Sequence, residues 1–192
     1  FLSKHFFTYR YDYREEWLKF TETLSSLSQN RAGVGIIQAM SQISLSKAGL
    51  LVSRDAATEF SEVYAHNMAP PVPYLNGNLA EWLSETGWII DLYEVKSSPA
   101  SYEGLELPRW CEAYPNLWLI VPLFFQRELE GILYLGKTDL KDSLNWEDRD
   151  LLKTAGRQAA SFLAQRRANS ALVEARQFEA FNKLSAYVIH DL

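Results

Sequence analysis

The sequence predicts an α+β domain, in which a central, mostly antiparallel sheet is flanked by helices and helical extensions lie at both ends. Three observations carry this prediction. Apolar residues recur at helical spacing near the start, short segments rich in β-formers fill the middle, and a long helical pattern closes the chain. The chain has 192 residues, 47% hydrophobic and 22% charged, a globular composition that suits one domain with extensions.

Residues 1–30 predict a linker helix that begins near Asp12. Asp12 and Glu15 have the spacing of a capping box. The apolar seam that follows has heptad-like spacing and consists of Trp17, Phe20, Leu24 and Leu27. Two interpretations stay open: the seam packs on the chain's own domain, or it pairs with the same helix of a second copy.

A second helix is expected from Ala32 to Lys47, with Gly49 as the left-handed residue that ends it. A hairpin follows. Residues 48–55 and 59–67 are its two strand candidates, because both are rich in apolar and β-branched residues and the second alternates apolar with polar positions.

Residues 69–78 are a loop by composition, since they include three prolines. Asn78 could cap a short helix that Gly87 ends, and WIIDLYEV, residues 88–95, then predicts a strand. Residues 96–115 read as a long irregular connection. Loops of this length in compact domains often cover a binding site.

Two more strands are predicted at 117–125 and 131–137, joined by a turn at QRELEG, residues 126–131. The remainder, from Trp146 to Leu192, predicts one helix or two in tandem. The polar stretch QRRANS, residues 165–170, interrupts its apolar face and could be a joint between two segments.

Charge and cysteine content narrow the function classes. A net charge of −5 and an isoelectric point near 5.3 disfavour nucleic-acid binding. Cys111 is the one cysteine, so an internal disulfide is excluded and a reducing, cytosolic setting is favoured. No pair of His, Cys or carboxylate residues has convincing metal-ligand spacing. Neither a transmembrane-length apolar run nor a signal peptide is evident.

Four short motifs follow one another in the second half of the chain. They are Val121–Pro122–Leu123, the G-x-L-x-L strand Gly131–Leu135, the dipeptide Glu147–Asp148, and the L-L-x-x-x-x-x-Q-x-A pattern from Leu151 to Ala160. In this order they resemble the end of a GAF domain. The resemblance implies a GAF sensor domain over residues 31–165, with a small-molecule site between the sheet and the loops and helices after the second strand.

Aromatic residues from that part of the chain are the candidates for such a site, because aromatic faces with a few polar tips suit small ligands. The candidate ligand-binding residues are Tyr64, His66, Trp82, Trp88, Tyr102, Trp110 and Tyr114. Core packing is the alternative explanation. Glu112 rather than His follows Cys111, which disfavours bilin attachment, and the N-K-x-F-D-E signature of cyclic-nucleotide GAF domains is absent.

The last residues, FNKLSAYVIHDL, resemble the approach to the phosphoacceptor site of sensor histidine kinases. The resemblance implies that His190 is the phosphoacceptor and that the adjacent Asp191 orients its ring and raises its basicity. Residues 166–192 would then be a signalling helix and the start of the dimerisation and phosphoacceptor domain. We expect the chain to be a non-catalytic piece of a longer kinase, whose missing domain would bind ATP and Mg²⁺.

Three segments together resemble the PrsK family of sensor histidine kinases, associated with the PEP-CTERM exosortase systems of Gram-negative bacteria. They are KHFFTYRYDYREEWL, LNWEDRDLLKTAGRQAA and RQFEAFNKLSAYVIHDL. The resemblance implies a membrane-spanning region upstream, and hence a cytoplasmic domain of an inner-membrane protein. It also implies a homodimer through the terminal helices and a response regulator as partner.

The alternative function is a GAF module that binds no ligand and only dimerises or docks a partner. A pocket filled by side chains would favour this alternative. A defined cavity with converging polar groups would favour a sensor.

Overall fold

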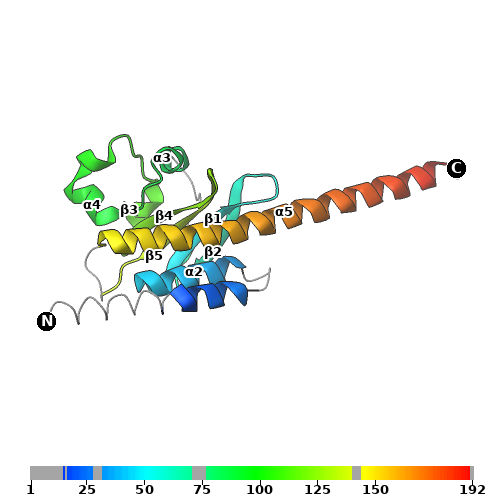
Figure 1. The fold of residues 1–192 in the computed structure, drawn as a ribbon. Helices are drawn as coiled ribbons and strands as arrows, with labels where there is room; N and C mark the ends of the chain where they lie inside the picture. The colour runs from blue at the N-terminus through cyan, green and yellow to red at the C-terminus, as the bar shows by residue number, and fades with distance from the viewer. Residues whose placement is uncertain (1–14, 16, 28–31, 71–76, 140–143, 191–192) are drawn as a thin grey trace.

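The computed structural model describes residues 15, 17–27, 32–70, 77–139 and 144–190. Its centre is a five-stranded sheet of order β2-β1-β5-β4-β3, in which every pair of neighbours is antiparallel (Figure 1). The strands are β1 (Gly49–Arg54), β2 (Phe60–His66), β3 (Ile90–Asp91), β4 (Leu117–Phe125) and β5 (Glu128–Gly136). The predicted α+β class with a mostly antiparallel sheet is therefore confirmed.

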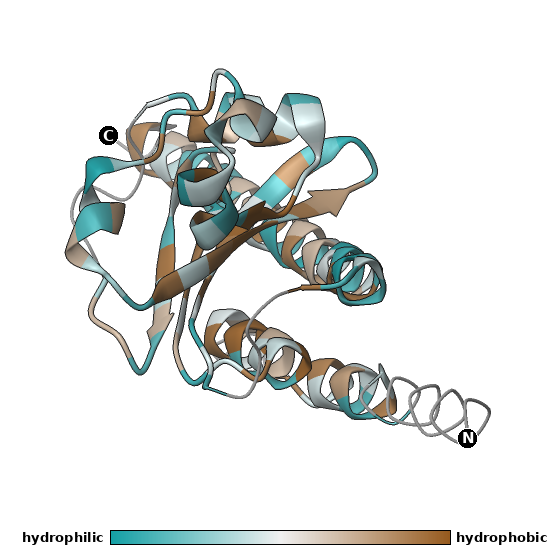
Figure 2. Ribbon diagram, turned by 90° about the vertical axis from the view of Figure 1, so that its left-hand side faces the viewer, coloured by the Kyte–Doolittle hydropathy of each residue, from teal (hydrophilic) through white to brown (hydrophobic). Residues whose placement is uncertain are grey.

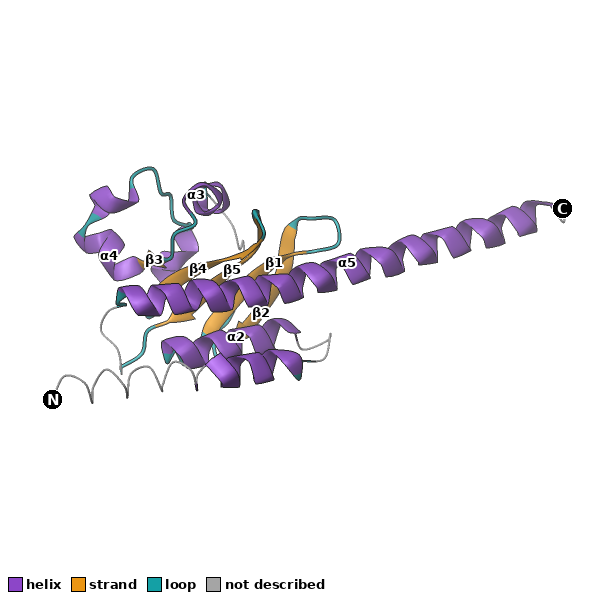
Figure 3. Cartoon of the chain, viewed as in Figure 1, coloured by secondary structure: helices purple, strands orange, loops and turns teal. Residues whose placement is uncertain are grey.

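Helices cover both faces of this sheet (Figure 3). The N-terminal helix, described over residues 17–25, lies with α2 (Ala32–Ser44) and the first half of α5 (Trp146–His190) on one face. The other face carries α3 (Leu79–Thr86), α4 (Leu92–Ser97) and two 3₁₀ helices, η2 (Pro99–Tyr102) and η3 (Arg109–Ala113).

Alternation along the strands divides the core between these two faces. Leu51, Val121 and Leu133 belong to the cluster beneath α2 and α5, whereas Val52 and Ile132 belong to the cluster beneath α3 and α4. Figure 2 shows the resulting apolar strands between helices that carry both apolar and polar residues. The strands β1, β4 and β5 contain apolar runs because both faces of the sheet are covered there, whereas the edge strand β2 alternates apolar with polar residues.

The N-terminal helix packs on its own domain. Phe20 is fully buried, Leu24 is 9% exposed, and the Trp17 ring stacks on Phe20 at 5.6 Å between centroids. This outcome agrees with the first of the two interpretations of the seam, and the buried pair is not available to a second copy. The predicted start at Asp12 lies outside the described residues.

Glycines let α2 approach its neighbours closely. A Cβ on Gly33 would lie 2.1 Å from Cγ of Tyr64 on β2, and one on Gly35 would lie 2.0 Å from a methyl carbon of Leu27. Gly49, however, does not end this helix. It is the first residue of β1, paired with His66, and Leu45 takes the left-handed conformation after the last helical residue instead (φ 59°).

The segment predicted as a strand at residues 88–95 is mostly helical. Only Ile90 and Asp91 pair with β4, and α4 begins at Leu92. The Asp91 carboxylate caps α4 by accepting hydrogen bonds from the backbone N–H groups of Tyr93 and Glu94 at 3.0 and 3.4 Å. A side-chain cap ends the strand although the local residues favour β-structure.

Two smaller expectations also change. Asn78 makes no side-chain cap on α3; its side chain joins the backbone of Gly104 and Glu106 instead. The predicted QRELEG turn is shorter, because β5 already begins at Glu128 and Gln126 supplies the left-handed turn residue (φ 56°). Gly87 ends α3 in the left-handed conformation as predicted, with φ 63°.

The helix α5 is one uninterrupted element of 45 residues. Its first half packs on the sheet, and its second half extends well beyond the domain (Figure 1). QRRANS is therefore not a break in the helix. None of the described helices is both long enough and apolar enough to span a bilayer.

Candidate functional site

Three of the predicted aromatic residues, Trp82 in α3, Trp88 just after it and Tyr102 in η2, form one cluster. The rings of Trp82 and Tyr102 stack at 6.0 Å, and Trp88 meets both rings edge-on at 6.2 and 6.3 Å. The Trp82 indole donates a hydrogen bond to the backbone carbonyl of Glu103 at 3.1 Å. Trp82 and Tyr102 are 7% and 5% exposed, so these two residues fill the space rather than line a cavity.

The second aromatic cluster joins η3 to the sheet. Trp110 meets Tyr114 edge-on at 5.6 Å and lies 4.9 Å from the ring of Tyr134 on β5. The Tyr114 hydroxyl donates a hydrogen bond to the carbonyl of Ala69 at 2.9 Å, which fastens η3 to the chain that follows β2.

Tyr64 and His66 lie on the opposite face of the sheet from these two clusters. The Tyr64 ring packs against α2, its hydroxyl donates to Glu62 at 2.9 Å, and the Arg166 guanidinium lies 5.5 Å from its ring centre. His66 contacts Asn67 at the rim of a separate open hollow. The seven candidates therefore do not converge on one site.

A hollow of about 360 Å³ lies between α4 and η3 on the α3/α4 face. Aliphatic side chains and prolines make most of its wall, and Tyr114 is the one member of the predicted set that lines it. Its other wall residues include Leu92, Val95, Lys96, Leu107, Cys111 and Glu112. A second hollow of about 210 Å³ adjoins it and shares Tyr114, Pro115 and Leu117.

These wall residues carry no motif in the sequence. Leu92 and Val95 belong to the segment predicted as a strand, in which successive side chains alternate between faces and Val95 would point away from Leu92. In α4, Val95 and Lys96 follow Leu92 by three and four residues, so all three line the same hollow.

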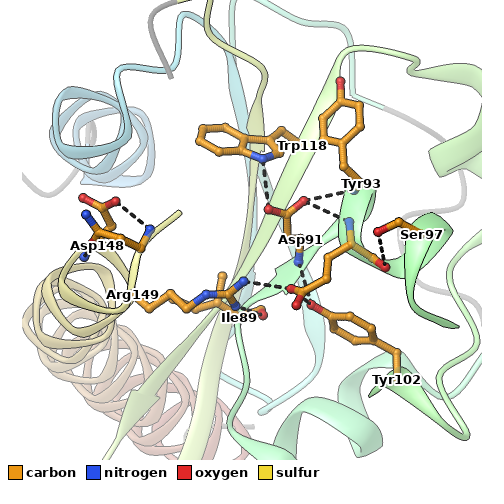
Figure 4. Close-up of polar contacts among 10 residues, drawn as sticks. Ile89, Asp91, Tyr93, Ser97, Tyr102, Trp118, Asp148 and Arg149 are labelled. Carbon is orange, nitrogen blue, oxygen red and sulfur yellow. Dashed lines mark hydrogen bonds and ion pairs between the residues drawn. The ribbon is translucent and has the colours of Figure 1, made fainter. Parts of the chain in front are cut away.

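A polar network connects α4 to the start of α5 (Figure 4). The Glu94 carboxylate accepts hydrogen bonds from the Tyr102 hydroxyl at 2.7 Å and from the Arg149 guanidinium at 2.8 Å. Arg149 also donates to the backbone carbonyl of Ile89 at 3.3 Å. The hydrogen bond from Tyr102, together with Arg149, lowers the pKa of Glu94, so this carboxylate stays ionised.

The other end of this network is buried in the sheet. The Trp118 indole donates to the second carboxylate oxygen of Asp91 at 3.4 Å, and burial with the bond to Glu94 raises the pKa of Tyr102 to about 12. Because α4 carries both Glu94 and the wall residues Leu92 and Val95, it lies between the hollow and α5.

Two further ion pairs hold α5 where it leaves the sheet. Arg166 binds both oxygens of Glu62 on β2 at 2.7 and 3.1 Å, and Arg167 binds both oxygens of Glu130 on β5 at 3.0 and 2.8 Å. Glu130 is only 1% exposed. Bidentate pairs of this kind fix the orientation of the helix as well as its position. We call these two pairs the exit clamp.

Beyond the exit clamp, α5 extends past the domain (Figure 1) and exposes large apolar side chains at half or more of their surface. They are Leu172, Val173, Phe178, Phe181, Leu184, Tyr187, Val188 and Ile189. His190 is the last residue of the helix, and its side chain, like all of Asp191, lies outside what the structure describes.

The structure describes no group of three or more His, Cys, Asp or Glu side chains that could hold a metal ion among residues 15, 17–27, 32–70, 77–139 and 144–190.

Several solved structures with the same architecture are GAF domains. The GAF domain of a sensor histidine kinase from Pseudomonas syringae pv. tomato matches 90% of this chain and 99% of its own, with a TM-score of 0.57 and 16% identity. The GAF domain of the potassium sensor histidine kinase KdpD from Escherichia coli matches 82% and 97%, with a TM-score of 0.53 and 14% identity.

A third neighbour, a methyl-accepting chemotaxis protein, matches 79% of this chain and 98% of its own, with a TM-score of 0.55 and 17% identity. No sequence-family model and no curated protein matches the chain. Similarity at these identities is similarity of fold. The chain has the GAF fold, which confirms the fold that the sequence motifs predict.

Proposed function

We propose that this chain is the sensory GAF region of a two-component sensor histidine kinase, which passes a signal along α5 to autophosphorylation on His190. The observation that carries the proposal is the continuity of α5. One helix runs without interruption from Arg149, bonded to α4, through the exit clamp to His190. The GAF folds of two sensor histidine kinases and a chemotaxis protein among its structural neighbours support a signalling role.

The mechanism would begin at the hollow between α4 and η3. A ligand that moves Leu92 or Val95 also moves Glu94 on the same short helix, and Glu94 holds Arg149 of α5. A small rotation or shift of α5 would then change how His190 is presented to the kinase domain. Asp191 would orient the imidazole and raise its basicity before the ring attacks the γ-phosphate of ATP.

The part of α5 beyond the exit clamp, which we call its free half, supplies a surface for a second copy. Phe178, Phe181, Leu184 and Val188 are spaced by three or four residues and are each at least 64% exposed. This spacing suits the seam of a two-helix coiled coil, so we propose a homodimer through the C-terminal helix. The buried seam of the N-terminal helix makes no such contribution over residues 17–25.

The remaining parts of the proposal lie outside this sequence. ATP and Mg²⁺ would bind the kinase domain, a response regulator would accept the phosphoryl group, and a preceding membrane-spanning region would place this domain at the cytoplasmic side of an inner membrane. Assignment to the PrsK family of PEP-CTERM systems rests on the sequence resemblance alone. The net charge of −5 disfavours a nucleic-acid partner.

The test uses the longer protein that includes the ATP-binding domain, incubated with ATP labelled at the γ-phosphate. The parent protein should become labelled and the His190→Gln variant should not. His66→Gln is the matched control, because it removes a histidine at the rim of the sheet and should leave labelling unchanged. Equal labelling of the parent and the His190→Gln variant would place the acceptor elsewhere.

One observation favours the alternative of a GAF module that binds no ligand. The rings of Trp82, Trp88 and Tyr102 pack on one another and fill the space between them, as in a purely structural core. The full protein would then show no labelling even when folded, and partner docking or dimerisation would be its function.

A further inference from the structure

The hollow between α4 and η3 has an apolar interior. Leu92 and Val95 of α4 line it together with Leu107 and Leu117. Cys111 adds to the apolar surface, because burial raises the pKa of its thiol to about 12 and the group stays uncharged at neutral pH. A volume of about 360 Å³ is at the lower end of the range for small-molecule sites.

Two residues of opposite charge also line this hollow. Lys96 lies in the last turn of α4, and Glu112 lies in η3 on the other side. Both residues are exposed, and neither side chain forms an ion pair or a hydrogen bond with another residue that the structure describes. By contrast, Glu94, which lies on α4 with Lys96, accepts hydrogen bonds from Tyr102 and Arg149.

The combination of an apolar interior with one free cation and one free anion selects a particular kind of ligand. A carboxylate would bind Lys96, an ammonium group would bind Glu112, and an apolar side chain would enter between the leucines and Val95. A ligand with a carboxylate but no ammonium group would leave Glu112 unpaired, and a ligand with an ammonium group but no carboxylate would leave Lys96 unpaired. An uncharged apolar molecule would use the interior alone.

We propose that this hollow binds a small apolar zwitterion, namely a free amino acid with a hydrophobic side chain. This inference rests on the proposed sensory function and names the ligand class of its site. Binding would draw Lys96 toward the hollow and move α4, which carries Glu94 and hence Arg149. The ligand would therefore act on the same helix that leads to His190.

The experiment measures binding to the 192-residue chain by isothermal titration calorimetry. The probes are L-phenylalanine and L-leucine, with three analogues: 3-phenylpropionate lacks the ammonium group, phenethylamine lacks the carboxylate, and glycine lacks the side chain. At least one of the two amino acids should bind at least tenfold more tightly than each analogue.

Variants assign the two charges. Glu112→Gln should weaken amino-acid binding about tenfold and leave 3-phenylpropionate binding unchanged, whereas Lys96→Met should weaken amino-acid binding and leave phenethylamine binding unchanged. Glu103→Gln and Lys153→Met are matched controls, because these residues do not line the hollow. They should bind the amino acid as the parent chain does.

Three results would overturn the inference: no heat of binding with either amino acid at millimolar concentration, equal binding of an analogue, or an equal loss in the control variants. None of them touches the proposed function, since labelling of His190 in the longer protein is measured without an added ligand. Conversely, amino-acid binding by a protein that never labels His190 would keep the site and reject the kinase role.

Discussion

Replacing Arg167 by methionine should lower the free energy of unfolding by about 3 kcal/mol, because it leaves a buried carboxylate without its partner. The Glu130 side chain is 2% exposed and accepts two hydrogen bonds from Arg167, at 3.0 and 2.8 Å. Breaking a fully buried pair typically costs about 3–5 kcal/mol. The Arg167 side chain is 25% exposed, so water reaches part of the pair and the lower end of the range applies.

The second variant separates the charge effect from the loss of packing. Methionine keeps most of the apolar stem of either residue, so the double variant Arg167→Met with Glu130→Met removes both charges from the same place. Replacing a buried pair by apolar residues is often neutral. We therefore expect the double variant to unfold within about 1 kcal/mol of the parent chain.

Urea unfolding followed by the fluorescence of the six tryptophans measures these differences. The control is Lys183→Met, which breaks the pair between Lys183 and Glu179 on the free half of α5. The side chains of that pair are 71% and 68% exposed, so its loss should change the free energy of unfolding by less than about 0.5 kcal/mol. If Arg167→Met were as mild as this control, or the double variant as damaging as the single one, the reasoning would be wrong.

Three further predictions concern the core, the hollow and the network of α4. Gly33→Ala should destabilise the chain by about 1 kcal/mol in the same urea assay, because overlap with the Tyr64 ring outweighs the better helix propensity of alanine. Cys111 should react with iodoacetamide at pH 8 much more slowly in the folded chain than in urea, because its raised pKa of about 12 keeps the thiol protonated. Glu94→Gln should destabilise the chain at pH 7, and the difference from the parent in free energy of unfolding should disappear on acidification. The reason is that the pKa of Glu94 is lower in the folded chain than in the unfolded chain. The ionised carboxylate therefore stabilises the fold fully above the unfolded pKa near 4.3, and this stabilisation is lost as the pH falls through the folded pKa. A pH-independent difference in urea midpoints would contradict this last prediction.

Much of the fold could be predicted because the strands and helices follow simple periodicities. The apolar runs at β1, β4 and β5 predicted buried strands. The seam of Phe20 and Leu24 predicted a helix with an apolar face, but left open whether that face packs on its own domain or on a second copy. The prediction of a strand at WIIDLYEV was wrong because it used the β-propensity of these residues and did not consider that Asp91 can cap a helix. Asp91 and Glu94 have the three-residue spacing of a capping box, which is a signal that the sequence does carry.

The candidate site was harder to predict because it depends on which face each residue takes. Tyr64 and Trp82 are both aromatic candidates for the site, and nothing in the sequence separates them. In the fold, Tyr64 packs against α2 and Trp82 packs against Tyr102 on the opposite side of the sheet. The hollow is lined mostly by aliphatic residues that carry no motif. Its charged residues, Lys96 and Glu112, come together only through the turn between η2 and η3.

The same problem affects the polar stretch QRRANS, which by its sequence could be a joint between two segments. Its arginines have partners 104 and 37 residues earlier in the chain, so no local pattern could show that they anchor the helix. A polar interruption of an apolar face can mark the place where a helix is bound most firmly to its domain, provided that buried carboxylates face it.

The two attachments of α5 bear on how a signal could travel. Arg149 and Arg166 are 17 positions apart, which corresponds to about 26 Å of helix at 1.5 Å per residue. A helix held at only one point could follow a movement of α4 without straining any other contact. Because α5 is held at Glu94 and again at the exit clamp, and packs on β4, a shift or rotation of the helix that starts at Arg149 and passes the exit clamp has to strain the bidentate pairs there. In the proposed mechanism, the exit clamp would therefore decide which movements of α4 pass along α5: a movement too weak to strain the clamp would stay within the domain, and a stronger one would shift the part of the helix that leads to His190.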